Sequence, residues 1–312
     1  MRATFVKTLE ELAQKDKRVF CVLGDTGFSV FEGFEKKFPQ QFLNVGIAEQ
    51  NFVSFGAGLA AMGMRPFIYN VASFMTYRAF EQIELDVCYQ ENPVVLVGVG
   101  GGHAYGTAGP THHAYFDLAL MSGLPNITVI CPADPVEMRA AMIYAYQLRK
   151  PVYIRIGRSA NDVIHAEKIL KFTEPSALLM SKGCNEADAV LLATGTMVKD
   201  AMQAVALLQK QGIVVRLYSV PFIKPLDTSP LEWALNSCTP IFTLEEHSMR
   251  GGLGTAVEEA LQQFTMKPVT FKKFGFPDMF APVTGSRDYL NDLYGLSPVK
   301  VAAQITQTLE AP

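Results

Sequence analysis

Short apolar runs alternate with helical patterns along the whole chain. The first half contains runs rich in β-branched and aromatic residues, at positions 19–23, 66–69, 94–97, 127–130 and 152–154. Segments with apolar residues at helical spacing lie around them, at positions 3–15, 48–63, 77–90 and 134–149. Continuous apolar runs separated by helices are typical of parallel strands that are buried on both faces of a sheet. The pattern therefore predicts an α/β fold, with a mostly parallel sheet covered by helices.

The pattern weakens between residues 170 and 185 and then starts again. The second set has apolar runs at 189–193, 214–218, 241–244 and 269–271, with helical patterns at 197–211 and from 252. A length of 312 residues agrees with two domains. We predict two stacked α/β domains, at residues 1–165 and 187–312, joined by a linker at 166–186.

Composition and charge exclude several classes of protein. The 27 basic and 30 acidic residues give a net charge of −3, and no Lys/Arg run exists that could follow a nucleic-acid backbone. Charged residues make up only 18% of the chain, below the usual ~25%, so we expect a partner to cover part of the surface. The widely spaced cysteines form no CxxC pair, which argues against a zinc site or a disulfide framework. We expect each to be a small core residue: Cys21, Cys88, Cys131, Cys184 and Cys238.

One uncharged stretch, residues 92–116, is long enough to cross a bilayer. It contains six glycines, two prolines and three histidines, which would be costly in lipid. The first residues also lack the apolar region of a signal peptide. We therefore expect no membrane segment and a cytoplasmic protein.

Two segments of the first half carry candidate binding residues. At residues 44–50, an extended segment passes through Gly46 into a helix, which places Glu49 in the first turn. By itself, this is also the pattern of an ordinary glutamate at a helix N-terminus. In residues 73–80, Phe74, Tyr77 and Phe80 recur every three positions and would line one face of a helix. Such a face either packs in the core or stacks against a flat heteroaromatic ring.

A glycine-rich segment after the 94–97 run carries three of the five histidines, His103, His112 and His113. Loops that leave the carboxyl ends of parallel strands are where ligands bind in such sheets. Asp117 is the only nearby acid, so proton transfer or oxyanion contacts are favoured over metal binding. Arg158 at a strand end, together with Arg2, forms either an anion clamp or surface salt bridges.

In combination, these segments resemble the carboxyl-terminal half of a transketolase. The resemblance lies in Val45-Gly46-Ile47-Ala48-Glu49-Gln50, the three aromatic residues, Gly109-Pro110-Thr111-His112 and Arg158. The later segments 193–195, 245–248 and 251–254 resemble the family's C-terminal domain. Each motif is modest, but together they are specific to thiamine-diphosphate enzymes.

The resemblance implies roles for the cofactor residues. Glu49 corresponds to the glutamate that hydrogen-bonds N1′ of the aminopyrimidine and promotes the imino tautomer that activates the thiazolium carbon. Phe74, Tyr77 and Phe80 correspond to the aromatic residues that line the pyrimidine, with Tyr77 at the stacking position.

The resemblance also implies the substrate residues. His112 corresponds to a histidine that contacts the sugar donor near its carbonyl and hydroxyl groups, and His103 to a second one. Arg2 and Arg158 correspond to residues that hold the anion at the far end of the sugar, and Ser29 assists them.

Transketolases also have a preceding domain that holds the diphosphate and Mg²⁺ through a GDG motif. Gly24-Asp25-Thr26 is only part of such a motif, so no metal ligand is assigned to this chain. The resemblance implies one subunit of a split transketolase, a transferase active only with a separate diphosphate-binding subunit, in an α2β2 heterotetramer. The reaction would move a two-carbon ketol unit from an anionic ketose, such as a sugar phosphate, to an aldose.

One position departs from the family pattern. Transketolases usually have Asp before Gly-Pro-Thr-His, where it binds a substrate hydroxyl, whereas this chain has Ala108. We therefore expect a donor or acceptor outside the standard pentose phosphates. Other interpretations are the beta chain of a 2-oxo-acid dehydrogenase, a 1-deoxyxylulose-5-phosphate synthase-like half, and a non-catalytic partner subunit.

Overall fold

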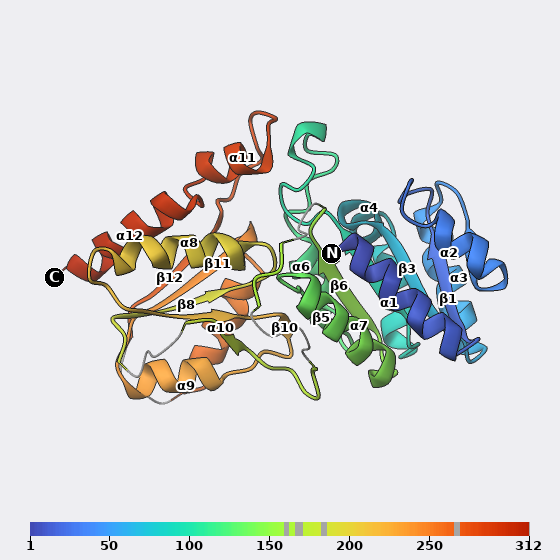
Figure 1. Cartoon of the computed structure of the whole chain (residues 1–312), viewed down its shortest axis with the longest axis horizontal. Coiled ribbons are helices and arrows are strands. Elements are labelled where there is room, and N and C mark those ends of the chain that lie inside the picture. Colours follow the sequence, from blue (N-terminus) through green and yellow to red (C-terminus); the bar gives the residue numbers. More distant parts are fainter. Residues whose placement is uncertain (159–161, 166–170, 182–185, 265–268, 312) are drawn as a thin grey trace.

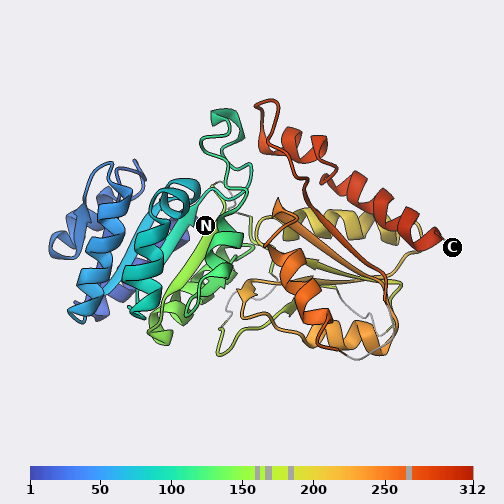
Figure 2. The same cartoon turned by 180° about the vertical axis from the view of Figure 1, so that it is seen from behind.

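The computed structural model describes residues 1–158, 162–165, 171–181, 186–264 and 269–311. It contains two mostly parallel sheets side by side, each covered by helices (Figures 1 and 2). The predicted fold class is confirmed. The linker predicted at 166–186 includes residues 166–170 and 182–185, which lie outside the described residues.

The first sheet has seven strands in the order β10-β5-β6-β4-β3-β1-β2. All neighbours in it are parallel except β10 and β5. Its strands are β1 (Val19–Leu23), β2 (Phe42–Asn44), β3 (Arg65–Val71), β4 (Val95–Val99), β5 (Thr128–Ile130), β6 (Val152–Ile156) and β10 (Phe222–Lys224). Every residue of β3, β4 and β6 is buried, as expected from their continuous apolar runs.

The second sheet has five strands in the order β12-β11-β8-β9-β7, and only the short β7 is antiparallel to its neighbour. Its strands are β7 (Leu178–Leu179), β8 (Ala189–Ala193), β9 (Val215–Ser219), β11 (Ile241–Ser248) and β12 (Phe271–Phe276). The element β10 follows β9 in the chain but joins the first sheet. The two sheets are therefore linked by a strand as well as by packing.

Helices bury both faces of the two sheets. One core lies under α1 (Arg2–Lys15) and α7 (Pro135–Leu148) on the first sheet. Another lies under α8 (Met197–Gln209) and α12 (Pro298–Glu310) on the second. A third core joins the two sheets under α3 (Glu49–Ala61), α6 (Asp117–Gly123), α9 (Ser229–Asn236) and α10 (Leu253–Leu261). Other helices are α2 (Glu32–Lys37), α4 (Ala72–Arg78), α5 (Phe80–Gln82), α11 (Arg287–Leu293) and the short turns η1 (Pro39–Gln41) and η3 (Gly106–Ala108).

Two expectations from the sequence differ from the structure. The single helix expected at 77–90 is instead α4, α5 and the π-helix η2 (Ile83–Tyr89), because the backbone leaves the helical region at Ala79 with φ −114° and ψ 26°. Cys21, Cys88 and Cys131 are buried as expected, but the expectation is wrong for Cys238, which is exposed. Cys184 lies outside the described residues.

No helix in the described part of the chain is both long enough and apolar enough to span a bilayer. The uncharged stretch at 92–116 instead forms β4 and the loop that follows it. We refer to residues 100–116 as the 100–116 loop.

A buried polar network connects the two sheets at the carboxyl ends of β6 and β11. Arg155 of β6 pairs with Asp117 at 3.0 Å and donates to the backbone oxygen of Glu246 at 2.7 Å. The Glu246 carboxylate accepts the backbone N–H of His103 at 2.9 Å and the Arg287 Nε–H at 2.7 Å. Because each buried charge has a partner from another segment, the network holds the 100–116 loop against the second sheet.

His103 belongs to this network. Its ring is fully buried, with Nδ1 3.1 Å from Asn291 Oδ1 and Nε2 2.7 Å from the Tyr115 hydroxyl. Burial lowers the pKa of His103 to about 4, and it does the same for His247. Both imidazoles are therefore neutral in the folded protein near neutral pH.

This burial predicts a pH dependence of stability. The unfolded chain takes up a proton on His103 near its ordinary pKa of about 6.5, whereas the folded chain does so only near pH 4. The contribution of His103 to the free energy of unfolding is therefore fully present above about pH 6.5, and it is lost as the pH falls towards 4. In His103→Gln, the slope of the free energy of unfolding against pH should fall by up to about 1.4 kcal/mol per pH unit in this window.

Urea unfolding of both proteins at several pH values measures these slopes. The lost packing of the His103 ring lowers the free energy of unfolding equally at every pH, so it does not change the slope. Equal slopes in the two proteins would show that His103 is not held neutral by the fold.

Candidate functional site

Glu49 is the first residue of α3, at the position expected from the sequence. The chain leaves β2, turns at Gly46 with φ +78°, and enters the helix. Only 8% of Glu49 is exposed, and its Oε1 accepts a hydrogen bond from an Arg78 Nη–H at 2.7 Å. Among the described residues, no hydrogen bond involves its second carboxylate oxygen. Glu49 is thus a largely buried carboxylate with one oxygen available.

The three predicted aromatic residues do not share one environment. Phe74 in α4 lies under the Arg78 guanidinium, whose carbon is 4.0 Å from the ring centre. Tyr77 is partly exposed, and its hydroxyl accepts the backbone N–H of Phe116 at 3.0 Å. Phe80 packs against the core shared by the two sheets, because the helix breaks between Tyr77 and Phe80. Tyr77 therefore offers exposed ring surface, the Phe74 ring is covered on one face by the partner of Glu49, and Phe80 packs in the core.

His112 lies in the 100–116 loop beside these rings. Its ring meets Phe74 edge to face at 4.9 Å and lies 5.9 Å from Tyr105. The Thr111 hydroxyl is 3.0 Å from its Nδ1. The imidazole is half-buried, so it can reach a ligand while its orientation is supported by neighbours.

Arg2, Ser29 and Arg158 line one pocket, although they are far apart in the sequence. This pocket, of about 450 Å³, also contains Lys7 and Glu10. Arg2 begins α1, and Ser29 follows β1 with φ +61°. Among the described residues, no ion pair involves Arg2 or Arg158. Two arginines without carboxylate partners, Arg2 at the N-terminus of α1 and Arg158 after β6, make this pocket suitable for an anion.

A continuous row of contacts connects this pocket to Glu49. Arg158 lies 4.6 Å from the Tyr105 ring centre, and the row continues through His112, Phe74 and Arg78 to Glu49. The predicted residues at the two ends of the site are therefore joined by a line of rings and guanidinium groups. A ligand with a flat ring, a reactive carbonyl and a distant anion could lie along it.

His103 does not lie in this row. It was expected beside His112, but its burial between Phe276, Tyr115 and Asn291 leaves no ring surface toward the row of contacts. The sequence carried no signal for this, because Asn291 is 188 positions away.

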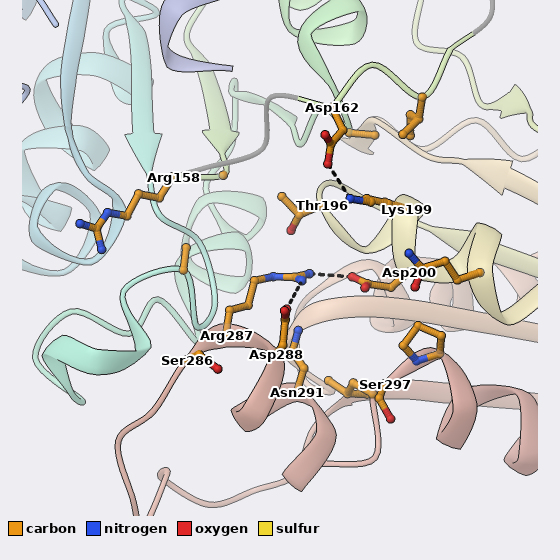
Figure 3. A pocket seen from close by; sticks show the side chains of 17 residues that line it. Arg158, Asp162, Thr196, Lys199, Asp200, Ser286, Arg287, Asp288, Asn291 and Ser297 are labelled. Carbon is orange, nitrogen blue, oxygen red and sulfur yellow. Dashed lines mark hydrogen bonds and ion pairs between the residues drawn. The ribbon is translucent and has the colours of Figure 1, made fainter.

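A second, larger cavity of about 620 Å³ lies where the two domains meet (Figure 3). Apart from Arg158, its charged side chains are paired with each other, for example Arg287 with Asp200 at 2.8 Å and Lys199 with Asp162. Figure 3 shows that Arg158 lies at the border of this cavity and points its guanidinium away from the other charges. Arg158 is therefore directed to the smaller pocket with Arg2.

Two residues of the row, Arg78 and Tyr105, were not expected from the sequence. Arg78 adjoins Tyr77, but its pairing with Glu49 depends on how α4 packs beside α3. Tyr105 stands in the glycine-rich segment, where the clustered histidines are the only signal of chemistry. Each side chain contacts a predicted residue that is distant in the sequence, and no local pattern reports such contacts.

The residues near Glu49 fit an aminopyrimidine. A carboxylate oxygen is available for a ring nitrogen, and the exposed Tyr77 ring offers flat apolar surface. The described residues do not form a metal site, because they include no group of three or more His, Cys, Asp or Glu side chains arranged to bind an ion. A diphosphate with its metal would thus need groups from elsewhere.

Comparisons with known proteins agree with this geometry. Residues 1–162 match the transketolase pyrimidine binding domain, and residues 181–301 match the transketolase C-terminal domain. One of the subunits of the apulose-4-phosphate transketolase of Phocaeicola vulgatus is 36% identical over 278 residues, which cover 89% of this chain and 87% of that protein. The 6-deoxy-6-sulfo-D-fructose transketolase subunit of a Clostridium species is 34% identical over 311 residues, which cover 98% and 94%.

A solved structure is also similar over the whole chain. It is a split-gene transketolase, described as an inactive β4 tetramer, with a TM-score of 0.86 and 34% identity, and the match covers 99% of this chain and 97% of that one. By contrast, the chain spans only 45% of the 1-deoxy-D-xylulose-5-phosphate synthase of Halothermothrix orenii, to which it is 32% identical. The chain thus belongs to the transketolase family of thiamine-diphosphate enzymes and carries that family's pyrimidine-binding and C-terminal domains.

Proposed function

We propose that this chain is one subunit of a thiamine-diphosphate-dependent transketolase, a transferase that moves a two-carbon ketol unit from a ketose to an aldose. The observation that carries this proposal is the row of contacts from Glu49 to Arg158. It provides, in order, a carboxylate, aromatic rings, a histidine and an anion pocket. The carboxylate and the rings suit the aminopyrimidine of the cofactor, and the histidine and the anion pocket suit a ketose with a terminal anion.

When bound, thiamine diphosphate supplies the nucleophilic carbon that breaks and remakes the carbon–carbon bond. In our proposal, Glu49 holds a proton between its carboxylate and N1′ of the aminopyrimidine. Phe74 and Tyr77 orient that ring and keep water from it, and Phe80 supports them from the core. The largely buried position of Glu49 favours a short, directed hydrogen bond over one shared with solvent.

The same chain would orient the sugar. His112 holds the donor near its carbonyl and hydroxyl oxygens and can move a proton there. Arg2 and Arg158, with Ser29, hold the terminal anion. Because the anion is fixed far from the reacting carbons, its binding energy can align the donor for bond cleavage.

We further propose that activity requires a separate diphosphate-binding subunit in an α2β2 heterotetramer, with Mg²⁺ held by that partner. Support comes from the relatives named as transketolase subunits and from the related β4 assembly described as inactive. Large apolar side chains are exposed around the site, which suits a surface that a partner covers: Phe28, Ile47, Tyr77, Phe116 and Phe280.

For the substrate, we propose a modified anionic sugar. Ala108 lies exposed in η3, four residues before His112, where the family usually has a carboxylate. A site without that acceptor gives no preference to the hydroxyl that it would bind. Relatives named for apulose 4-phosphate and 6-deoxy-6-sulfo-D-fructose act on unusual sugars with an anionic group, which supports this choice.

A second candidate is a 1-deoxyxylulose-5-phosphate synthase-like half, because such synthases are among the relatives at 32% identity. The assembled enzyme would then release CO₂ from pyruvate. Ketol transfer without CO₂ release from pyruvate would favour the transketolase, and it would also argue against a 2-oxo-acid dehydrogenase subunit or a non-catalytic partner.

Glu49→Gln should reduce turnover of the assembled enzyme by about 100-fold or more, because an amide cannot hold the proton at N1′. Folding and assembly should stay intact, since Gln has the same shape. The matched control is Glu232→Gln, which changes an exposed first-turn glutamate of α9. Turnover close to wild type in Glu49→Gln would contradict the assigned role.

The purified chain alone should show no transketolase activity and weak binding of thiamine diphosphate. Addition of the diphosphate-binding subunit with Mg²⁺ should restore both, as measured by calorimetry and a coupled assay. Full activity of the chain alone would contradict the split assembly.

A kinetic panel of ketoses and aldoses tests the substrate proposal. We expect a modified anionic sugar to exceed xylulose 5-phosphate and ribose 5-phosphate in kcat/KM. Ala108→Asp should shift this preference towards the two pentose phosphates. If they already form the best pair for the wild type, the substrate proposal is wrong.

A further inference from the structure

We propose that Tyr105 is a positioning residue that holds the Arg158 guanidinium at the far end of the sugar site and thereby sets the enzyme's preference for anionic donors. This inference rests on the proposed function, because it requires that a substrate anion binds beside Arg158. No motif of the sequence pointed to Tyr105.

The contact between the two side chains is a cation–π contact. The guanidinium carbon of Arg158 lies 4.6 Å from the centre of the Tyr105 ring. Among the described residues, no carboxylate pairs with Arg158. A carboxylate would orient the guanidinium but would also neutralise it. A ring face orients the guanidinium and leaves its N–H groups and its charge available to a ligand.

Tyr105 contacts Arg158 and lies close enough to Arg2 to feel its charge. The charges of Arg158 and Arg2 both act on its hydroxyl, although burial dominates and raises the pKa of Tyr105. The hydroxyl is therefore neutral and can donate a hydrogen bond. The centre of its ring also lies 5.9 Å from the centre of the His112 ring. Tyr105 thus stands between the residue proposed to contact the sugar and those proposed to hold its anion.

The position of the ring is itself determined by the loop. Gly100 has φ +85°, and any side chain there would overlap the Tyr105 ring. The backbone of residues 103–108 forms tight turns around Tyr105, with hydrogen bonds from Gly106 N to His103 O and from Ala108 N to Tyr105 O, both 2.8 Å. Because these turns also lead to His112, the spacing between His112 and Arg158 depends on where Tyr105 stands.

The first test compares D-fructose 6-phosphate with D-fructose as ligands of the assembled enzyme. Tyr105→Leu should weaken binding of D-fructose 6-phosphate by about 3- to 30-fold, the range of a cation–π contact. Binding of D-fructose should change less than about 2-fold, since it has no anion to place. Tyr105→Phe keeps the ring and should retain most of the wild-type preference. With the enzyme's best anionic donor, Tyr105→Leu should lower kcat/KM, with a larger change in KM than in kcat.

A second variant moves the ring without removing it. Gly100→Ala should displace Tyr105 and reproduce the effect of Tyr105→Leu. Its control is Gly212→Ala, because Gly212 has a similar φ of +82° but no atom near enough to meet a side chain. The control separates backbone strain from displacement of the ring.

The outcomes separate this inference from the proposed function. If the wild type prefers D-fructose 6-phosphate and Tyr105→Leu keeps that preference, the role of Tyr105 is wrong and the proposed function stands. An equal loss for both sugars would indicate a general structural role and would also overturn the inference. A wild type that prefers neither D-fructose 6-phosphate nor any other anionic ketose of the kinetic panel to an uncharged ketose would contradict the anionic substrate of the proposed function, and the inference with it.

Discussion

The buried ion pair between Arg155 and Asp117 supports the rest of the site. Both side chains are almost completely inaccessible, so neither charge is solvated by water and each requires the other. Arg155 also donates to the backbone oxygens of Ala114 and Glu246, which belong to the 100–116 loop and to the second sheet. Loss of one partner would leave a buried charge unpaired, and the loop that carries Tyr105 and His112 would lose its attachment.

Two glycines at the start of this loop, Gly101 and Gly102, are required by the same buried charges. Side chains at Gly101 and Gly102 would overlap Arg155 and Glu246, respectively. In the sequence, this glycine-rich segment after a buried strand suggested a ligand-binding loop. In the structure, these two glycines allow the backbone to approach two buried charged side chains. The glycine-rich segment is thus a consequence of close packing between the domains, and the ligand-facing residues come after it.

The C-terminal domain contributes no residue to the row of contacts from Glu49 to Arg158, but it supports the loop that carries two of them. Glu246 holds the backbone of His103 in place, while Asn291 and Phe276 enclose the His103 ring. These residues stabilise the start of the 100–116 loop, and its later part presents Tyr105 and His112 to the first domain. The second sheet therefore acts on the site by supporting a loop of the first.

The sequence by itself determined the fold class and the alternating order of strands and helices. Its motifs and their resemblance to a family also named the candidate site residues, which were Glu49, Phe74, Tyr77, Phe80, His103, His112, Arg2, Ser29 and Arg158. Apolar periodicity reports burial, and motifs report chemistry, over windows of a few residues. The tertiary structure alone decided that β10 joins the first sheet, that His103 is a buried support, and that Arg78 and Tyr105 complete the row of contacts. Each of these depends on contacts between distant segments, whose strength comes from burial and charge pairing that no local pattern records.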